Sequence, residues 1–547
     1  MGAALAGLST PAAADKGVQI WGFSNASGTE LKFEWNNGDQ KVTAAPGQMM
    51  GGKSCWGNIT GTLDKYFEIH VDQSSALVEL VAKIDPTFGD AVMTGFSPSS
   101  GQVMGNIWPT TYNSQNNPSQ VSQSPAGNAG QVQINYGMYS AYKKDSTPIA
   151  GHDQAYAYVT PPMGTWMGDL RNASQSAWDA ATLKDVVLPG AHDAGMWTLA
   201  PPINSGSQIL SFLTTLEGLL HFVPGFPIVA KTVEEGAFNA AQNFALTQKD
   251  SPTKAMQHGI RYFDYRPAQV LGGLPGFDDA DYYHVHNFVP GYSFNSFLND
   301  VGNFLTDSGN EHEIIIVNVK DSGILGTSSS DPSKTGDIFV PLYADSADLS
   351  SAQTWITNVL GNQFPDLSPL FIEDFEAVSS KSLGALYNAN NRLIFYFGTG
   401  YNDSYPQSKS QQEATYGTFD PSNVISALNT ALPTCQTDTS NYTVFQLQDT
   451  VTDYLASNIG STHDEIQQAL ISDNGSALLS TKGMFDNQTY PWALQNLSSC
   501  TTMAVMLNDF AGNLLAYNAK TLTNARINGG SVNVPQQGSC SSAKLKQ

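Results

Sequence analysis

Two patterns of apolar positions divide this chain of 547 residues. In the first, short runs alternate apolar and polar residues, are rich in β-branched and aromatic side chains, and are separated by turn-forming residues. Such runs are typical of half-buried strands, and Asn37-Gly38 between two of them is typical of a tight hairpin turn. We therefore expect a small all-β, sandwich-like domain over residues 17–158. Its expected strands cover residues 17–25, 30–35, 40–44, 66–72, 76–84 and 130–142.

From about residue 160 the apolar runs become continuous and alternate with helical patterns such as residues 293–309. Continuous apolar strands indicate burial on both faces, as when helices cover a parallel sheet. The expected fold class is therefore α/β, and the length fits a TIM-type (β/α)8 barrel over residues 159–527. A doubly wound open sheet is the alternative, but no strand is followed by a glycine-rich phosphate-binding sequence. The expected strands cover residues 185–190, 260–266, 282–288, 313–320, 392–398, 443–449 and 503–509.

The two ends of the chain fall outside these domains. Residues 1–16 contain an apolar piece followed by small residues, which is typical of a signal-peptide remnant, although an unstructured leader fits equally well. Residues 528–547 are expected to form a C-terminal tail. The longest apolar stretch, residues 209–230, carries Glu217 and is broken by Pro224 and Pro227, so we do not expect it to span a membrane.

The composition excludes some classes of partner. The net charge is −23 and the pI is about 4.5, so we expect no nucleic-acid partner. Only 13% of the residues are charged, while Ser, Thr, Asn and Gln are plentiful, a surface composition common in extracellular proteins. Roughly eight Asn-x-Ser/Thr sequences, among them those at Asn172, Asn402, Asn441 and Asn496, add mild support. We therefore expect a secreted glycoprotein.

The four cysteines, Cys55, Cys435, Cys500 and Cys540, lack the spacing of a zinc site. Two disulfides are consistent with their even number. A single bridge between Cys435 and Cys500 beside two unpaired thiols is equally consistent, so the sequence leaves the pairing open.

Polar residues follow or end most of the expected barrel strands. In a parallel barrel the carboxyl ends of the strands meet at one rim, where catalytic residues lie. The first strand runs into Pro189-Gly190 and then into His192 and Asp193. A single histidine or aspartate at a strand end is more often a capping residue, but many of them at one rim favour a functional site. The others, several of which share a face because side chains alternate along a strand, are Asp264, Arg266, His284, His286, Asn318, Lys320, Asp449 and Asp509.

This set of side chains fits the cleavage of a phosphodiester. One imidazole can take the proton of an attacking hydroxyl while a second protonates the leaving oxygen. A guanidinium can neutralise the charge that develops on the phosphoryl oxygens. A carboxylate beside each imidazole fixes its tautomer and raises its pKa.

Five sequences in this half of the chain occur in a familiar order: LPGAHDAGM, TQKDSPTKAMQHGIRYFDYRP, YYHVHN, EIIIVNVKD and MAVMLNDF. Together they resemble the X-domain of phosphatidylinositol-specific phospholipases C, and most of all the bacterial and fungal branch of the PLC-like phosphodiesterases. The resemblance covers residues 160–525. It implies a phospholipid or related phosphodiester as substrate, met at a membrane surface. It also implies a reaction in which a headgroup hydroxyl attacks phosphorus, giving a cyclic phosphate and diacylglycerol.

The resemblance further implies roles for the acid–base residues. His192 resembles the general base that activates the attacking hydroxyl, and Asp509 resembles the aspartate that orients it. His286 resembles the general acid, with Asp193 as its carboxylate partner. His284, on the same face of the same expected strand, is a rival for the role of acid and is otherwise expected to bind substrate.

Arg266 resembles the arginine that holds the phosphate, with Asp264 as its acidic neighbour. The calcium-dependent branch of the family has acidic ligands where Arg266 stands, so the resemblance implies a metal-independent site with no cofactor. The acidic run at Asp278, Asp279 and Asp281 leaves Ca²⁺ or Mg²⁺ binding open. The remaining expected substrate-binding residues are Lys320, Asp449 and Asn318.

Three positions depart from the family pattern. Asn287 follows the expected acid where glycine is usual, Val451 stands where a tyrosine stacks on inositol, and Gly398 replaces a headgroup arginine. Two alternatives therefore stay open: a different phosphodiester with a neighbouring hydroxyl, or a lipid- or glycan-binding surface protein that has lost turnover. The apolar residues 209–226 form either an interfacial lid over the site or a helix packed against the barrel.

Overall fold

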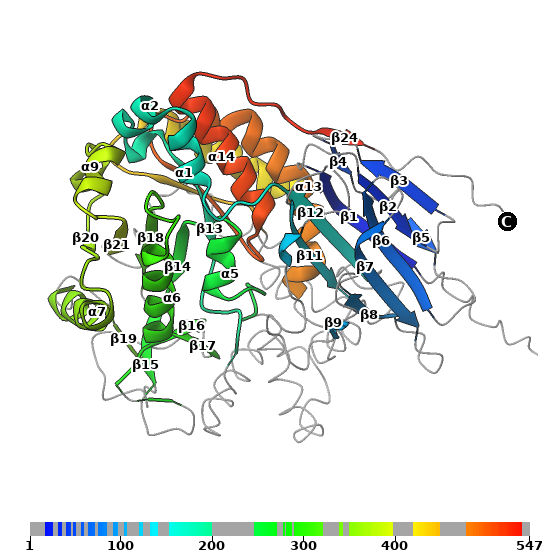
Figure 1. Ribbon diagram of the computed structural model, residues 1–547, viewed down its shortest axis with the longest axis horizontal. Coiled ribbons are helices and arrows are strands. Elements are labelled where there is room, and N and C mark those ends of the chain that lie inside the picture. The colour runs from blue at the N-terminus through cyan, green and yellow to red at the C-terminus, as the bar shows by residue number, and fades with distance from the viewer. Residues whose placement is uncertain are drawn as a thin grey trace, which may run out of the picture.

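A seven-stranded parallel sheet forms the centre of the second half of the chain (Figure 1). The computed structural model describes residues 153–199, 245–270, 277–278, 280–286, 289–320, 339–342, 349–397, 420–448 and 477–538, and strand segments between 17 and 139. The strands of the sheet are β13 (Val187–Ala191), β14 (Tyr262–Tyr265), β18 (Ile315–Val319), β20 (Leu370–Ile372), β21 (Leu393–Phe397), β22 (Thr443–Gln446) and β23 (Ala504–Asn508). They lie in the order β20-β21-β18-β14-β13-β23-β22, and every neighbouring pair is parallel.

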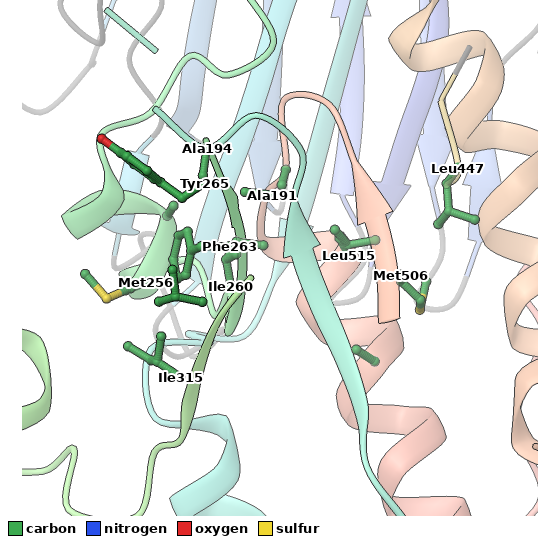
Figure 2. Close-up of a cluster of buried hydrophobic side chains, with 14 of the residues drawn as sticks. Ala191, Ala194, Met256, Ile260, Phe263, Tyr265, Ile315, Leu447, Met506 and Leu515 are labelled. Carbon is green, nitrogen blue, oxygen red and sulfur yellow. The ribbon is translucent and has the colours of Figure 1, made fainter. Parts of the chain in front are cut away.

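Both faces of this sheet are buried, which explains why its strands are continuously apolar. Around β18, Ile315 and Val317 belong to one core cluster, while Ile314 and Ile316 belong to a second cluster on the other face. Figure 2 shows part of the first cluster, to which the strands contribute side chains such as Phe263. Because each fully buried Leu, Ile or Phe side chain contributes about 1.5–3 kcal/mol, the two clusters fix the register of the sheet.

Helices flank the sheet and close its amino end. α1 (Trp166–Ala173) and α2 (Gln175–Ala180) precede β13 and bury Trp166 and Trp178 in the second cluster. α14 (Asn513–Asn528) packs along β13. The expected helix over 293–309 is α6 (Phe294–Thr306), which begins where the Ser293 hydroxyl accepts a hydrogen bond from the backbone N–H of Ser296. The other helices are α5 (Pro252–Gln257), α7 (Leu349–Gln363), α8 (Glu376–Ser379), α9 (Leu383–Asn388), α10 (Pro421–Thr437) and α13 (Ala477–Asn496).

Six of the seven expected barrel strands lie in the parallel sheet. The exception is the strand expected at 282–288, because β16 (Tyr283–His286) pairs antiparallel with β15 (Pro267–Val270) and β17 (Val289–Ser293). With β19 (Phe339–Pro341) these strands form a separate four-stranded sheet. The prediction of a barrel strand there was wrong because an apolar pattern does not reveal the partners of a strand. β20 was not expected, since three residues are too few to show a pattern.

Where the sequence predicts an eight-stranded barrel, the described residues contain one seven-stranded parallel sheet. Among the described residues, no pairing joins the edge strands β20 and β22. The fold class is thus a mixed α/β fold with a seven-stranded parallel sheet, and closure into a (β/α)8 barrel stays a prediction.

Two further sheets contain the strands expected in the first part of the chain. β2 and β3 pair antiparallel, while the predicted turn at Asn37-Gly38 lies outside the described residues. The predicted domain boundary at residue 158 falls inside β12, and β24, in the predicted tail, pairs with β4. One sheet has the order β10-β11-β12-β1-β4-β24 with β5 beside β1, and the other has the order β3-β2-β6-β7-β8-β9. Their bounds are β1 Gly17–Asn25, β2 Leu31–Trp35, β3 Gln40–Ala44, β4 Gln48–Met50, β5 Trp56–Asn58, β6 Asp64–Val71, β7 Ser75–Ile84, β8 Ala91–Phe96, β9 Val103–Asn106, β10 Gln120–Gln123, β11 Val132–Tyr139, β12 Asp153–Thr160 and β24 Gln536–Gly538.

Buried hydrogen bonds fasten the sheet that contains β12 to the α/β part. α13 and α14 lie against β11 and β12. At the start of α14, the amide of Asn513 donates to the carbonyl of Gln133 at 2.8 Å and to the carbonyl of Tyr158 at 3.2 Å. The same amide lies 3.0 Å from the hydroxyl oxygen of Thr160. These polar groups are buried, so their hydrogen bonds hold the two parts in one arrangement.

Cys435 of α10 and Cys500, just before β23, form a disulfide. In the described part of the chain no helix combines the length and hydropathy needed to cross a bilayer. Several expectations concern residues outside the described part: Cys55, Cys540, Asp279, Asn287, Gly398, Asp449, Val451, residues 1–16 and residues 209–226.

We predict that His258 makes the fold sensitive to mild acid. Its side chain is buried, and neither ring nitrogen has a hydrogen-bond partner among the described residues. Burial lowers the pKa of His258 to about 4. Between pH 6.5 and 4 the unfolded chain therefore binds a proton that the folded chain does not, so the free energy of unfolding falls as the pH drops, by up to about 3 kcal/mol. Denaturant titrations of wild type and His258→Leu at pH 7, 5.5 and 4.5 measure this, and an equal loss in both proteins would contradict it.

Candidate active site

The carboxyl ends of β13 and β23 bring His192 and Asp509 together. The two strands are neighbours with Ala191 opposite Asn508, so the residue after each strand lies at the same level. His192 Nδ1 lies 2.8 Å from Asp509 Oδ1. His192 is 16% exposed and Asp509 is 3% exposed. This short contact places a proton on Nδ1 and leaves Nε2 as the basic nitrogen of the neutral imidazole.

Both turns that carry this pair contain a residue with left-handed backbone geometry. Asp193 follows His192 with φ of 43°, and Phe510 follows Asp509 with φ of 47°. A non-glycine residue in this region costs roughly 1–2 kcal/mol, so each turn needs support from its surroundings. Strain of this kind collects at functional sites.

Thr247 and Gln248 supply that support to both turns at once. The Thr247 hydroxyl donates to the carbonyl of Asp193 at 3.1 Å, and the Thr247 carbonyl accepts from the N–H of Phe510 at 2.7 Å. The Gln248 amide donates to the carbonyl of His192 at 2.7 Å and accepts from the N–H of Ala511 at 3.0 Å. One dipeptide therefore fixes the separation between His192 and Asp509.

The carboxylate of Asp193 lies at the centre of the site and is fully buried. Its Oδ2 lies 3.4 Å from His192 Nε2 and 3.6 Å from His286 Nδ1. Its Oδ1 lies 2.9 Å from Arg266 Nε and 3.4 Å from His284 Nε2. Three imidazoles and a guanidinium thus share one carboxylate.

Arg266 connects Asp193 to a second buried carboxylate. Its Nη2 lies 3.2 Å from Asp264 Oδ2 and 3.4 Å from His192 Nε2. Lys320 Nζ lies 3.6 Å from the other oxygen of Asp264. Because the guanidinium is 18% exposed while both carboxylates are fully buried, its accessible side is the part that an anion can reach.

The pKa values of the two partly exposed histidines, His192 and His286, shift in opposite directions. Burial alone would lower the pKa of His192, but Asp193 and Asp509 outweigh it, so the pKa is raised above its ordinary value. For His286 burial outweighs the attraction of Asp193, so its pKa is lowered. Burial alone would raise the pKa of Asp193, yet Arg266 and the neighbouring imidazoles hold it well below its ordinary value.

Burial and neighbouring charges also shift the pKa values of Asp264 and Lys320. The pKa of Asp264 is lowered, because Lys320 and Arg266 outweigh the effect of burial. Burial lowers the pKa of Lys320 to about 7, against the opposing effect of Asp264. Lys320 is therefore close to half-charged at neutral pH.

The structure separates the two rival histidines. His284 is fully buried, lies edge-on to the Tyr265 ring at 4.8 Å, and accepts a hydrogen bond on Nδ1 from the N–H of Arg266 at 3.2 Å. His286 is 20% exposed. A Cβ on Gly195 would lie 2.2 Å from Cβ of His284, so only glycine admits this imidazole beneath the turn. His284 therefore contacts Asp193 from the buried side of the site, at 3.4 Å. The prediction that His284 binds substrate does not fit this burial.

Within the described residues, His192, Asp193 and Asp264 could hold a metal ion, since one donor atom from each lies within 4.8 Å of the others. Carboxylate and imidazole donors suit several divalent cations. Arg266 and Lys320 contact the same carboxylates at 2.9–3.6 Å, so a cation would compete with their charges. Asp281, part of the acidic run, accepts bonds from the hydroxyl of Ser293 and the N–H of Asn295 and serves the start of α6.

The structure thus gathers most of the expected site residues into one cluster, to which β16 of the four-stranded sheet contributes His284 and His286. The residues that the carboxyl ends of the parallel strands contribute are His192, Asp193, Asp264, Arg266, Lys320 and Asp509. Asn318 lies opposite Asp264 in the register of β14 and β18, is fully buried, and has no hydrogen-bond partner on its amide among the described residues. Thr247 and Gln248 were missed. They lie in the quoted TQKD sequence, but nothing in the pattern showed that this sequence bonds to both catalytic turns.

No family model and no curated protein sequence matches the chain. A solved structure of the phosphatidylinositol-specific phospholipase C of S. aureus, from work on the modulation of its membrane binding, is a distant structural neighbour. The sequence identity is 14% and the TM-score is 0.34, over 66% of this chain and 97% of that one. A likeness at this TM-score carries no argument about this chain.

We predict that the histidines of the site titrate apart. His192 titrates above about 6.5, and His284 and His286 below it, because the carboxylates outweigh burial only at His192. Imidazole NMR of the labelled protein, which has nine histidines, gives these values directly. Asp509→Asn should lower the pKa of His192, whereas Asp281→Asn, a buried carboxylate bonded to Ser293, should leave it unchanged. A His192 that titrates below its ordinary value in the wild type would overturn this reading of the site.

Proposed function

We propose that this protein cleaves a phosphodiester in a phospholipid headgroup by acid–base catalysis. The observation that carries the proposal is the contact of one buried carboxylate, Asp193, with His192 at 3.4 Å, His286 at 3.6 Å and Arg266 at 2.9 Å. Two imidazoles therefore lie on one oxygen of this carboxylate, and the guanidinium that would hold the phosphate lies on the other. That arrangement suits one proton removal and one proton delivery on either side of a phosphorus atom.

His192 acts as the base in this proposal. A hydroxyl next to the phosphodiester on the headgroup attacks phosphorus, and its proton passes to Nε2 of His192. The Nδ1–H bond to Asp509 at 2.8 Å holds the ring and stabilises the imidazolium that forms. The bond from phosphorus to the diacylglycerol oxygen breaks as the new bond forms, which leaves a cyclic phosphate.

His286 delivers the proton to the leaving diacylglycerol oxygen. Its Nδ1 faces Asp193, and its ring also bonds to the backbone carbonyl of Ala245. In the proposed reaction the charged imidazole gives its proton to the leaving oxygen, and both Asp193 and the Ala245 carbonyl favour this charged form.

Arg266 stabilises the charge on the phosphoryl oxygens. A guanidinium is always charged and presents two parallel N–H groups to a phosphate. Asp193 and Asp264 hold it at 2.9 and 3.2 Å, so it is oriented before substrate arrives. Because this cation stands where a metal ion would otherwise be needed, we propose a metal-independent reaction.

The substrate class and location rest on the sequence. The resemblance of the LPGAHDAG and GIRYFDYR sequences to phosphatidylinositol-specific phospholipases C makes phosphatidylinositol the first substrate to test. Lys320, whose Nζ lies 3.6 Å from Asp264, is the residue that we propose contacts a headgroup hydroxyl or phosphate. The Cys435–Cys500 disulfide fits an oxidising compartment, in line with the proposed secretion.

The decisive prediction concerns phosphatidylinositol vesicles in excess EDTA. We expect phosphorus NMR to show a strained five-membered cyclic phosphate with wild-type protein. His192→Ala should slow its formation by about 10²–10⁴-fold, and Arg266→Lys by about 10²-fold, because lysine loses the parallel donor pair. Lys520→Met, which breaks an exposed ion pair with Asp169, is the matched control and should keep full activity.

The same experiment tests the metal-independent reaction and the choice of phosphatidylinositol as substrate separately. Activity that appears only after Ca²⁺ is added would overturn the metal-independent reaction. A folded wild-type protein that leaves phosphatidylinositol intact with and without Ca²⁺ would overturn this substrate.

The pH dependence provides a further prediction. The productive state needs a neutral His192 and a charged His286, yet the pKa of His192 is raised and that of His286 is lowered. The productive fraction therefore rises with pH up to the pKa of His286, stays constant between the two pKa values, and falls above the pKa of His192. The profile of kcat/KM should be bell-shaped, with His286 setting the acidic limb and His192 the basic limb. Asp509→Asn should therefore move the basic limb to lower pH. A basic limb that stays in place in this variant would assign that limb to another group.

A further inference from the structure

A buried polar network lies directly behind the His192–Asp509 pair. Its centre is Asp486 on α13, which is fully buried. Asp486 Oδ1 accepts from Lys482 Nζ at 2.9 Å and from the amide of Asn508 at 2.8 Å. Asp486 Oδ2 accepts from the hydroxyl of Tyr158 at 2.8 Å. One carboxylate thus joins α13, the end of β23, and β12.

Tyr490 closes this network from within α13. Its hydroxyl lies 3.2 Å from Lys482 Nζ and 3.1 Å from the amide of Asn508. The Lys482 side chain is 2% exposed. A buried ion pair of this kind adds little net stability, because desolvation offsets the attraction of the charges. What the pair contributes is therefore mainly geometry, because Asp486 holds both Lys482 and the amide of Asn508 in place.

The network reaches the catalytic pair through two connections. Asn508 immediately precedes Asp509, and the Asn508 carbonyl accepts from the backbone N–H of His192 at 3.1 Å. The positive charge of Lys482 also opposes burial in setting the pKa of Asp509. A shift of Asn508 or a change in the charge of Lys482 would therefore be felt by the base.

Tyr158 connects the network around Asp486 to the sheet that contains β12. It lies on β12, which pairs with β1 and β11. Its ring stacks on Tyr156 at 5.0 Å and lies 6.3 Å from the ring of Tyr490. The ring is therefore held by packing while the hydroxyl alone enters the network, so Tyr158→Phe removes one hydrogen bond and little packing.

We infer that Tyr158, Lys482 and Asp486 are positioning residues for His192, and that β12 is part of the catalytic unit and not of a separable accessory domain. The inference rests on the proposed function for its kinetic test. The residues act through Asn508 and Asp509 and touch no reacting atom.

The test compares full-length wild type with Tyr158→Phe on phosphatidylinositol vesicles. We expect kcat to fall on the order of 10-fold, because the base is less well placed, and KM to change by less than about twofold. The lost donor leaves the Asp486 charge less compensated, so the pKa of His192 and the basic limb of the pH profile should rise. The other charged groups that face His192 or Asp509 stay in place: Asp193, Asp264, Arg266, His286 and Lys482.

Tyr387→Phe is the matched control. Its hydroxyl accepts a hydrogen bond from Trp178 at 2.8 Å, at the opposite end of the sheet just before β21. This variant also loses one tyrosine hydroxyl and should keep wild-type kcat and pH limbs.

A folded Tyr158→Phe with wild-type kcat and an unmoved basic limb would overturn the inference and leave the hydroxyl a purely structural role. If Tyr158→Phe fails to fold, the double variant Lys482→Met with Asp486→Asn decides, since it removes both charges together and leaves neither buried alone. A fall in its kcat at constant KM supports the inference, and an unchanged kcat overturns it.

NMR titration of His192 separates this inference from the proposed function. If wild type shows no turnover but the pKa of His192 still rises in Tyr158→Phe, the proposed function fails while the coupling to β12 stands. If wild type turns over and neither kcat nor the pKa changes in the variant, the coupling alone fails.

Discussion

The buried carboxylate of Asp193 is the constraint on which the rest of the site depends. It is fully buried, and an isolated carboxylate in such a place costs several kcal/mol. The guanidinium of Arg266 at 2.9 Å and the imidazoles within 3.4–3.6 Å offset that cost, and Arg266 has the largest effect among them. The same contacts also fix where the imidazoles point. Charge balance and catalytic geometry are therefore one requirement in this site.

Several costly local features follow from that requirement. Asp193 adopts a left-handed backbone so that its side chain turns inward, and Gly195 leaves room for His284 beneath it. Thr247 and Gln248 then hold the strained turn against the turn that carries Asp509. Taken singly, none of these features stabilises the fold by much. They are the strained turn at Asp193, the close contact of Gly195 with His284, and the hydrogen bonds of Thr247 and Gln248. Together they keep His192 and the guanidinium of Arg266 oriented without substrate, which the proposed reaction needs for electrostatic stabilisation of its transition state.

The sequence predicts the strand ends well because period-two alternation and continuous apolar runs are local signals. Asp264 and Arg266 share a face with Tyr262, and Asp509 shares a face with Leu507, which packs in the second core cluster as the alternation implies. Partner choice is not local, so the sequence placed β16 in the barrel, although its hydrogen bonds run antiparallel to β15. For the same reason it could not rank His284 against His286, whose burial depends on Tyr265 and Gly195. The burial of Lys482 and Asp486 was also hidden, because a Lys–Asp pair four residues apart usually indicates a solvated helix face. Here the packing of α13 against β1, β11 and β12 buries the pair.

The charges of the site also bear on when it becomes active. In the arrangement described, Asp193 and Asp509 favour a proton on His192, while burial disfavours one on His286. In the proposed reaction, a neutral His192 as base and a charged His286 as acid are therefore the minority state. A phosphodiester anion held by Arg266 would bring a negative charge close to His286 and would draw the guanidinium's charge away from Asp193. Both effects favour the charged form of His286, and Asp193, relieved of part of its pairing with Arg266, can hold that imidazolium more strongly. The substrate itself would then supply the charge that prepares the acid, so the site is prepared for proton transfer only where a phosphodiester is bound.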